Sequence, residues 1–577
     1  MLTRLGLANV PSAGERVDPE LPKPWNEWDR WLVVHGLSLA AAVPALLWVN
    51  RDQWFTADVW TVITTRGLGS SPQRLSVFYP HFEHWTTIPI LVYRALYSLF
   101  ALRTYLPYTL VLIVAQVTAA HLLWRLLLRT GVQRGFATGL AAVFAVLAIG
   151  WENLSSAWQI TIVAPVAFGF AALLVMPERG GFGRRDALCA AFLVVGLMCS
   201  GVGVTMTLVV GIAAFLRRGW RVAAATVAVP VVVYLVWLLT EGTKGQRSGV
   251  PLGTALGDLP SFVWNGLTEA VEGLTRIGRI GPIVVVLLAA WLAWRARPRA
   301  DPWPLVLAMS AGAVISLALT GVRRAGADPG TSRYAYVVVV LLIPALALAV
   351  QQRASVVVHR VGRRVVVVFA GLIVALLVAQ FVALDHYVET AFFSGEMRPR
   401  VLATAMLLRA HEPLISTNIF GIWFLPEPST ATIARFDRNG ELPGTGDITE
   451  ADVLTAREYV QMVIGSTGMF AEGKVSVAGT THARLVATGE PGCVRASPSA
   501  RPASVTIAFP IAASLRLETD RAWDVSMQLE ADDMRGRPRF VFAQRGNELA
   551  LSLARGDIDL VLGLPPHAAM TLCGLAM

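Results

Sequence analysis

Charged residues are scarce in this sequence: they make up only 15% of its 577 residues, whereas hydrophobic residues make up 55%. A water-soluble domain usually carries about 25% charged residues, so this composition excludes an ordinary soluble enzyme. Apolar stretches of helical length recur from residue 31 to about residue 384, and such stretches cross bilayers. The sequence therefore predicts a polytopic α-helical membrane protein.

Other absences narrow the class further. The four cysteines include no C-x-x-C pair, which excludes a zinc ribbon or a thioredoxin-like motif. Residues 1–30 are polar and are followed by no small-residue cleavage site, so we interpret them as an uncleaved cytoplasmic tail. The net charge of +10 would suggest nucleic acid in a soluble protein, but these arginines cluster at the ends of apolar stretches, where they set orientation. We expect no nucleic-acid partner.

The stretch 88–102 decides the topology. It is about 15 residues long, which is shorter than the roughly 17–25 residues of a spanning helix, and it contains Pro89 and Arg94. We expect it to lie flat at the membrane interface as an amphipathic helix. Without it, about eleven spans are predicted: 31–49, 105–127, 135–150, 157–176, 187–200, 201–216, 220–240, 281–294, 303–321, 334–351 and 365–384.

Alternate loops between these spans then become strongly basic. Their arginines are Arg125, Arg129 and Arg134; Arg179, Arg184 and Arg185; Arg217, Arg218 and Arg221; Arg295, Arg297 and Arg299; Arg353, Arg360, Arg363 and Arg364. The positive-inside rule places all five loops in the cytoplasm, with the N-terminus inside and the C-terminus outside. This topology requires a break between 187–200 and 201–216, for which Gly201 and Gly203 are the candidates.

The first outer loop, 50–104, holds the strongest candidates for chemistry. Asp58 opens it, and H-F-E-H-W follows at 81–85. A carboxylate there could take a proton from a hydroxyl group or hold a divalent cation. Glu83 lies between His81 and His84, and the three could bind a metal or divide acid and base roles. The alternative is a solvated connector, since His-x-Glu-His is no established zinc signature.

Three arginines lie in a loop that this topology places outside, where the charge rule does not explain them. They are Arg323, Arg324 and Arg333, and the last is followed by Tyr334. A guanidinium group binds phosphate through paired hydrogen bonds, so an anionic lipid headgroup would give these arginines a role. Anchoring of the span at the headgroup layer is the alternative.

Three features of the sequence resemble the C-type (GT-C superfamily) polyprenyl-phosphate-sugar-dependent membrane glycosyltransferases. They are the acidic start of the first outer loop, the segment H-F-E-H-W-T-T-I-P-I-L-V-Y-R that follows it, and S-R-Y at 332–334. The layout of residues 31–384 is most similar to protein O-mannosyltransferases and lipid A aminoarabinose transferases. Their corresponding segment carries a Pro-Pro-Leu that is absent here.

The resemblance implies roles for individual residues. It makes Asp58 a base or metal ligand, adds Glu83 as the second acidic residue and His84 beside it, and lets Asp58 and Glu83 hold a divalent cation such as Mg, Mn or Ca. It implies that Arg333 and Tyr334 contact the donor phosphate. The other candidates for donor or acceptor binding come from their place in the predicted outer loops: His81, Trp85, Glu152, Gln159, Lys244, Arg323 and Arg324.

The C-terminal part changes character. Residues 385–472 are a mixed connecting segment, and short runs with period-two alternation between 473 and 577 predict an outward-facing β-sandwich. On an oxidising side of the membrane, Cys493 and Cys573 would form a disulfide across its two ends; two free thiols are the alternative. This domain could bind a glycan or acceptor, or act as a structural lid.

These features together predict a glycosyltransferase at the outer face of a bacterial plasma membrane. It would move a sugar from a polyprenyl-phosphate donor to a cell-wall glycan, lipid or protein. Two alternatives are a flippase for a lipid-linked sugar, which would call for ionisable groups near the midplane and an internal repeat, and a non-catalytic glycan-binding scaffold.

Overall fold

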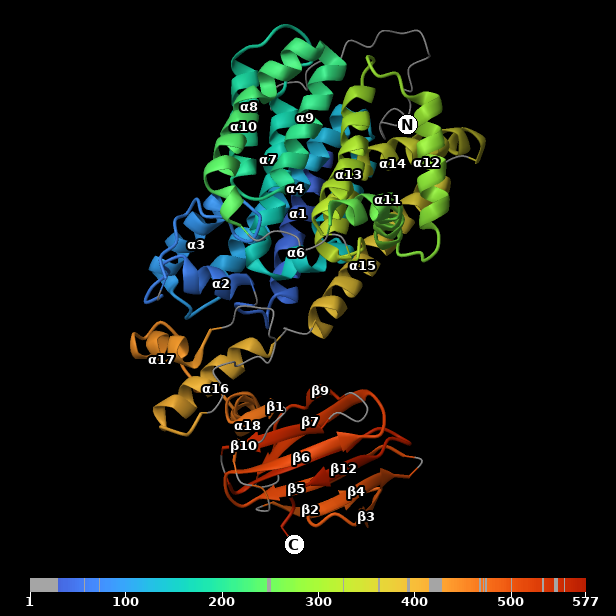
Figure 1. Ribbon diagram of the computed structural model, residues 1–577. Coiled ribbons are helices and arrows are strands. Elements are labelled where there is room, and N and C mark those ends of the chain that lie inside the picture. Colours follow the sequence, from blue (N-terminus) through green and yellow to red (C-terminus); the bar gives the residue numbers. More distant parts are fainter. Residues whose placement is uncertain are drawn as a thin grey trace. The chain divides into compact units, whose positions relative to one another are not determined.

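The computed structural model of the chain divides into two compact units (Figure 1). The helical unit comprises Met1–Gln53, Ser76–Ala95 and Leu106–Ser394, and the C-terminal unit comprises Trp54–Leu75, Leu96–Tyr105 and Gly395–Met577. The residues that the structure describes are 30–56, 58–71, 73–245, 251–324, 326–361, 364–391, 395–414, 428–465, 469–470, 472, 475–499, 501–531, 534–543, 548–554 and 556–576.

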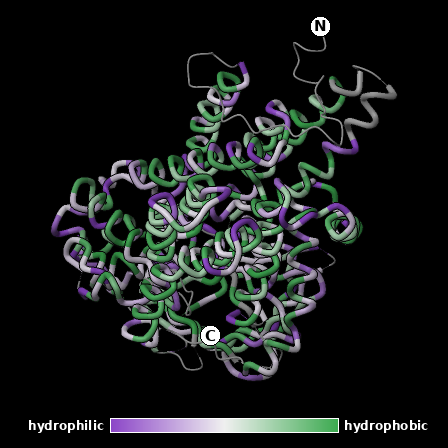
Figure 2. Tube along the Cα trace, turned by 90° about the horizontal axis from the view of Figure 1, so that it is seen from above, coloured by the Kyte–Doolittle hydropathy of each residue, from purple (hydrophilic) through white to green (hydrophobic). Residues whose placement is uncertain are grey.

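Long helices follow one another through the helical unit. They are α1 (Arg30–Val49), α3 (Thr87–Phe100), α4 (Leu106–Arg129), α5 (Arg134–Ala145), α6 (Trp151–Ser155), α7 (Ile160–Val175), α8 (Arg184–Leu197), α9 (Val202–Arg218), α10 (Trp220–Thr240), α11 (Leu252–Thr275), α12 (Gly281–Arg295), α13 (Trp303–Arg323), α14 (Ser332–Val361) and α15 (Arg364–Thr390). Hydrophobic residues dominate most of these helices (Figure 2).

Eight helices in the described part of the chain are long and apolar enough to cross a membrane, and each coincides with a predicted span. The other three predicted spans correspond to the shorter helices α8, α9 and α12, with 14, 17 and 15 residues. Residues 88–102 fall on α3, which has 14 residues. The polytopic helical fold class is confirmed.

The loops of this unit gather at two ends of the bundle. At one end, called the Arg218 end, Arg129 pairs with Glu178 at 3.0 Å, Arg217 with Asp301 at 2.9 Å and Arg218 with Asp186 at 2.6 Å. Four of the predicted basic loops therefore share one end.

The opposite end is called the Glu83 end and contains the loops at 76–86, 151–159, 198–201 and 324–334. The turn between α8 and α9 lies there, because the N–H of Ile88 donates to the carbonyl of Met198 and a Cβ on Gly201 would lie 3.1 Å from the ring of His84. The predicted break at Gly201 separates two helices, as the topology requires.

No span is predicted between 220–240 and 281–294, and this segment contains the 24-residue helix α11, which is not among the eight helices long and apolar enough to cross a membrane. Gly266 of α11 packs against Leu317 of α13, and Gly273 packs against Ile149 at the Glu83 end. Because α11 has its own buried apolar face but three acidic residues, its average hydropathy is that of an ordinary amphipathic helix.

The C-terminal unit contains two packed sheets, drawn in orange to red in Figure 1, which confirms the predicted C-terminal β domain. One sheet has the strand order β1-β10-β6-β12-β4-β3, and the other has β2-β5-β11-β7-β8 with β9 paired to β7. All pairs are antiparallel, and alternate residues of β5 and β7 are buried between the sheets. The strands are β1 (Met462–Gly465), β2 (Ser476–Thr481), β3 (Ala483–Ala487), β4 (Cys493–Pro498), β5 (Ala503–Phe509), β6 (Ala513–Thr519), β7 (Trp523–Ala531), β8 (Met534–Arg535), β9 (Arg539–Ala543), β10 (Glu548–Leu553), β11 (Ile558–Leu564) and β12 (Met570–Cys573).

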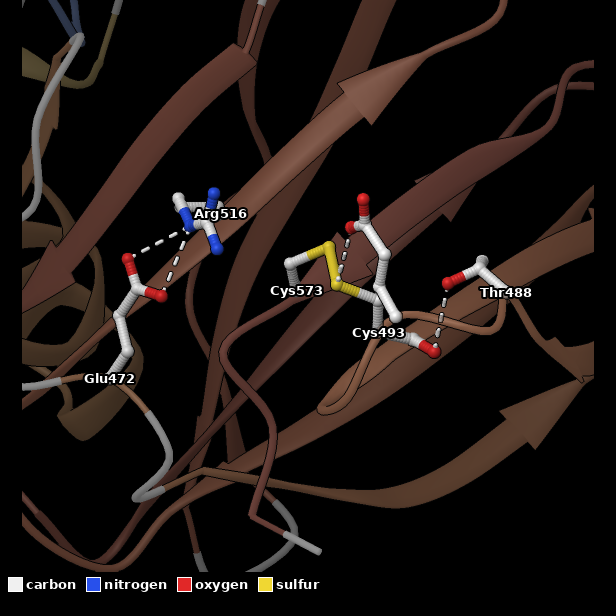
Figure 3. Close-up of a disulfide and its surroundings, with 6 residues drawn as sticks. Glu472, Thr488, Cys493, Arg516 and Cys573 are labelled. Atoms are coloured by element: carbon white, nitrogen blue, oxygen red, sulfur yellow. Dashed lines mark hydrogen bonds and ion pairs between the residues drawn. A yellow bond between two sulfur atoms is a disulfide. The ribbon is translucent and has the colours of Figure 1, made fainter.

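A disulfide joins Cys493 of β4 to Cys573 of β12, which are direct cross-strand partners (Figure 3). The carboxylate of Glu490 lies beside it. Both sulfurs are consumed by the disulfide, so this group of residues supplies no thiolate for a metal.

The C-terminal unit also includes three helices and part of the first predicted outer loop. The helices are α16 (Met397–Arg409), α17 (Thr430–Arg438) and α18 (Glu450–Val460), and the loop contributes α2 (Asp58–Thr65). The carboxylate of Glu441 accepts the N–H of Ser70 at 3.1 Å and the hydroxyl of Tyr97. The loop 50–104 is thus divided between the two units.

Candidate active site

A tight turn presents Glu83 at one end of the bundle. The N–H of His81 donates to the carbonyl of His84 at 2.9 Å, and the N–H of His84 donates back at 3.0 Å. Phe82 closes the turn with φ of 53°, the left-handed region that non-glycine residues seldom adopt. The turn leaves the Glu83 side chain half-buried.

Arg324 is the main partner of Glu83. Its Nε and Nη2 atoms donate to the same Glu83 oxygen, Oε1, at 2.9 and 2.5 Å. His84 Nε2 lies 3.5 Å from that oxygen. Arg324 follows α13 and Glu83 precedes α3, so tertiary folding joins residues 241 positions apart.

A second pair forms at the same end. Arg333, in the first turn of α14, donates from Nε to Glu152 Oε2 at 3.4 Å. The backbone fixes this geometry, because the N–H of Glu152 donates to Ser332 Oγ at 3.0 Å and Asn153 Nδ2 donates to the Ser332 carbonyl.

Tyr334 follows Arg333 in the first turn of α14 and is half-buried, near enough to the charges of Arg324, Arg333, Glu83 and Glu152 to interact with them electrostatically. These five residues and His84 are called the Glu83 cluster. The guanidinium groups remain accessible, since 42% of the Arg324 side chain and 39% of the Arg333 side chain are exposed.

The charges of the cluster keep Glu83 ionised. Burial acts to raise the pKa of Glu83, but the nearby charges of His84 and Arg324 and the hydrogen bonds from Arg324 outweigh burial and lower it. Glu83 is therefore a carboxylate at neutral pH. A carboxylate paired in this way accepts protons poorly until Arg324 is drawn to another anion.

A pocket of about 430 Å³ lies on the other side of the Glu152 and Ser332 wall. Its lining residues are Ile149, Trp151, Glu272, Gly273, Arg276, Gly278, Gly330, Ser332 and Tyr387. The sequence singled out neither Glu272 nor Arg276, because no helix was predicted for the segment that contains α11 and its C-cap, Arg276. Glu272 and Arg276 are four residues apart, so a predicted helix would have placed them side by side on one face.

The remaining residues predicted to bind substrate have different surroundings. His81 is buried and its ring packs edge-on against Trp158; Trp85 is buried and stacks on Trp237 at 5.2 Å. Burial favours packing roles for both. Lys244 pairs with Glu241 at 2.8 Å on the surface.

Two more predicted residues lie at the same end without entering the cluster. Gln159 is buried beside the start of α7, and Arg323 is exposed in the last turn of α13. Their part in binding stays a prediction.

Asp58 lies in the C-terminal unit, as the first residue of α2. A carboxylate at this position is favoured by the positive end of the helix dipole. Phe55, Val59 and Trp60 beside it are buried, and Asp58 itself is half-buried. The aromatic rings of Trp54 and Trp60 meet edge-on, which fixes the start of the helix.

The surroundings of Glu83 do not favour the predicted divalent cation. The oxygen that a cation would bind already accepts two N–H groups from Arg324, and the guanidinium charge repels a cation. Glu83 as found therefore does not fit a metal, and the cation that the sequence suggests stays a prediction.

No protein-family model and no curated protein matches this sequence. Among solved structures, the chain is similar to ArnT from Cupriavidus metallidurans, in a structure bound to undecaprenyl phosphate, with 14% identity and a TM-score of 0.41 over 75% of this chain and 92% of that one. It is also similar to arabinofuranosyltransferase AftD from Mycobacteria, with 11% identity and a TM-score of 0.35 over 93% of this chain and 62% of that one. These values assign no residue role in this chain.

Proposed function

We propose that this chain is a membrane glycosyltransferase that moves a sugar from a polyprenyl-phosphate donor to an acceptor hydroxyl at the outer face of a bacterial plasma membrane. The observation that carries the proposal is the Glu83 cluster, in which the accessible guanidinium groups of Arg324 and Arg333 pair with Glu83 and Glu152 at one end of the bundle. Acceptors of this class would be a cell-wall glycan, a lipid or a protein.

The arginines suit a lipid phosphate. Each guanidinium now pairs with one carboxylate, at 2.5 Å for Arg324 and 3.4 Å for Arg333. Exposed ion pairs of this kind contribute only about 0–1 kcal/mol, so a phosphate that binds both arginines can replace the carboxylates. Glu83 and Glu152 would then be released from their partners.

The proposed reaction is a single displacement with inversion. The acceptor oxygen attacks the anomeric carbon, the bond from that carbon to the phosphate oxygen breaks, and its electron pair leaves on polyprenyl phosphate. The hydroxyl proton goes to a carboxylate base, for which the sequence offers two candidates, Asp58 and Glu83, with His84 beside Glu83. Arg324 and Arg333 stabilise the phosphate charge that develops. No step is assigned to a metal ion.

The test uses the full chain in lipid nanodiscs with a radiolabelled polyprenyl-phosphate sugar. We expect Asp58→Asn to lower transfer by roughly 10²–10⁴-fold while donor binding persists. Arg324→Met and Arg333→Met should each weaken donor binding, whereas Arg295→Met, at the last turn of α12 near the Arg218 end, should leave it unchanged.

Full transfer by Asp58→Asn would remove Asp58 from the mechanism. Equal donor binding by all three arginine variants would remove the Glu83 cluster as the phosphate site. Movement of intact lipid-linked sugar across proteoliposomes without turnover would instead support a flippase.

A further inference from the structure

The pocket beside the Glu83 cluster has no part in the proposed phosphate site. We propose that it binds a saccharide unit of the acceptor, an inference that rests on the proposed function and names the substrate class of the same enzyme. Its lining residues come from α11, α15 and the segments 149–151 and 330–332, all within the helical unit. Figure 1 shows α11 and α15 running close together in this region.

The size of the pocket fits a sugar. A volume of about 430 Å³ lies in the range of ligand pockets and exceeds the space that one monosaccharide needs. Gly273 and Gly330 both line the pocket. Gly273 packs closely against Ile149, since a Cβ on it would lie 2.0 Å from Ile149 Cδ1 and 2.7 Å from Ile149 Cβ.

The side chains of the pocket combine two aromatic rings with two opposite charges. Trp151 and Tyr387 supply rings with polar tips, the type of side chain that packs on the apolar face of a sugar ring and still hydrogen-bonds. Glu272 accepts and Arg276 donates, so together they can satisfy neighbouring hydroxyl groups. A carboxylate in the wall disfavours a free phosphate as the ligand.

The structure holds these groups in place. Arg276 Nη1 donates to the Tyr387 hydroxyl at 3.1 Å, and its Cζ lies 5.3 Å from the centre of that ring. Glu272 Oε1 accepts the N–H of Gly281 at 3.1 Å. Arg276 is the C-cap of α11 and adopts φ of 59°, in the left-handed region where glycine is usual.

The pocket and the cluster share one wall. Trp151 and Ser332 face the pocket, whereas their chain neighbours Glu152 and Arg333 form an ion pair of the Glu83 cluster. Successive helical residues point about 100° apart, so one short segment can serve both sites. A saccharide in the pocket would place its hydroxyl groups beside the donor phosphate.

Saturation-transfer NMR on the full chain in nanodiscs tests the inference, with methyl glycosides of disaccharides that contain pentofuranose or hexopyranose rings as probes. We expect a saturation-transfer signal for at least one disaccharide. This signal should fall at least fivefold in Trp151→Ala and in Glu272→Gln. Trp294→Ala, which removes an indole that is 75% exposed on α12, should retain the signal. Arg324→Met should also retain it.

Two conservative variants guard against misfolding. Tyr387→Phe removes only the hydroxyl, and Arg276→Gln replaces the guanidinium group with a neutral, shorter amide; both should weaken the signal at an unchanged thermal midpoint. The inference would be overturned if no disaccharide gave a saturation-transfer signal, or if all pocket variants gave the same signal as the unmodified protein. Disaccharide binding with no sugar transfer from the polyprenyl-phosphate donor would instead count against the proposed function alone.

Discussion

The ion pairs at the Glu83 end are exposed enough for a ligand to replace their carboxylates as partners of the arginines. Glu83 and Glu152 satisfy the two arginines in the absence of donor, yet all four side chains remain between 20% and 42% exposed. By contrast, Arg218 and Asp186 at the opposite end are buried to 1% and 0% exposure. A buried pair is costly to break, at about 3–5 kcal/mol, so the Arg218 pair holds the fold while the Glu83 pairs can open for a ligand.

A buried carboxylate in the C-terminal unit should make its stability depend on pH. Glu458 is fully buried, and burial raises its pKa from 4.5 to about 8, although the N–H of Leu529 donates to it at 2.7 Å. Between pH 4.5 and 8 the unfolded chain releases this proton while the folded unit keeps it, so stability falls as pH rises and the loss is complete above pH 8.

We expect Glu458→Gln to remove much of this fall. Calorimetry of the full chain between pH 5 and 8.5 would show a flatter decline in the melting temperature of the C-terminal unit. Glu518→Gln, at an exposed position on β6, serves as the matched control. A slope identical to that of the unmodified protein would contradict a buried, protonated Glu458.

At the scale of elements, the turn between α8 and α9 depends on one close approach. A Cβ on Gly203 would lie 2.5 Å from the carbonyl oxygen of Gly196 and 2.6 Å from the N atom of Leu197. Backbone atoms at the end of a helix cannot move aside cheaply, so the two helices are packed in contact only because residue 203 has no side chain.

Gly203→Ala should therefore destabilise the helical unit by about 1–3 kcal/mol, the usual cost of overpacking. Gly371→Ala in α15 is the control, because a Cβ there meets nothing within 4 Å and alanine favours a helix by roughly 0.5–1 kcal/mol. Thermal unfolding of both variants in the same nanodiscs gives the comparison. Equal melting temperatures would show that the turn can relax.

At the scale of the whole molecule, the disulfide closes a large part of the C-terminal unit. Cys493 and Cys573 are 80 residues apart in sequence, and cross-links over long loops typically stabilise by about 2–4 kcal/mol. Disulfides persist in oxidising compartments, which supports the proposed outward orientation of this unit.

The double variant Cys493→Ala/Cys573→Ala should lower the free energy of unfolding of the C-terminal unit by roughly 2–5 kcal/mol. Denaturant unfolding of the full chain, followed by a probe in the sandwich, measures the change. Reduction of the unmodified protein should give the same loss, and Cys189→Ala, which removes a free thiol of α8, should leave this unit unchanged. No effect of reduction would show that the sheets alone stabilise the sandwich.

The membrane class, the apolar helices and the β character of the C-terminal unit could all be predicted from the sequence. Apolar length and period-two alternation are local patterns that can be recognised along a sequence. The pairing of Cys493 with Cys573 was predicted as well. The helix α11 was not, because its hydrophobic face is diluted by Glu269, Glu272 and other polar residues in any average over the segment.

Only the tertiary structure decided which polar residues meet. It joined Glu83 to Arg324 and Glu152 to Arg333 across 241 and 181 positions, moved His81 and Trp85 into packed surroundings, and formed the pocket of Trp151, Glu272, Arg276 and Tyr387. Side-chain charge and polarity are local properties. The distance between two such side chains depends on the packing of every helix between them.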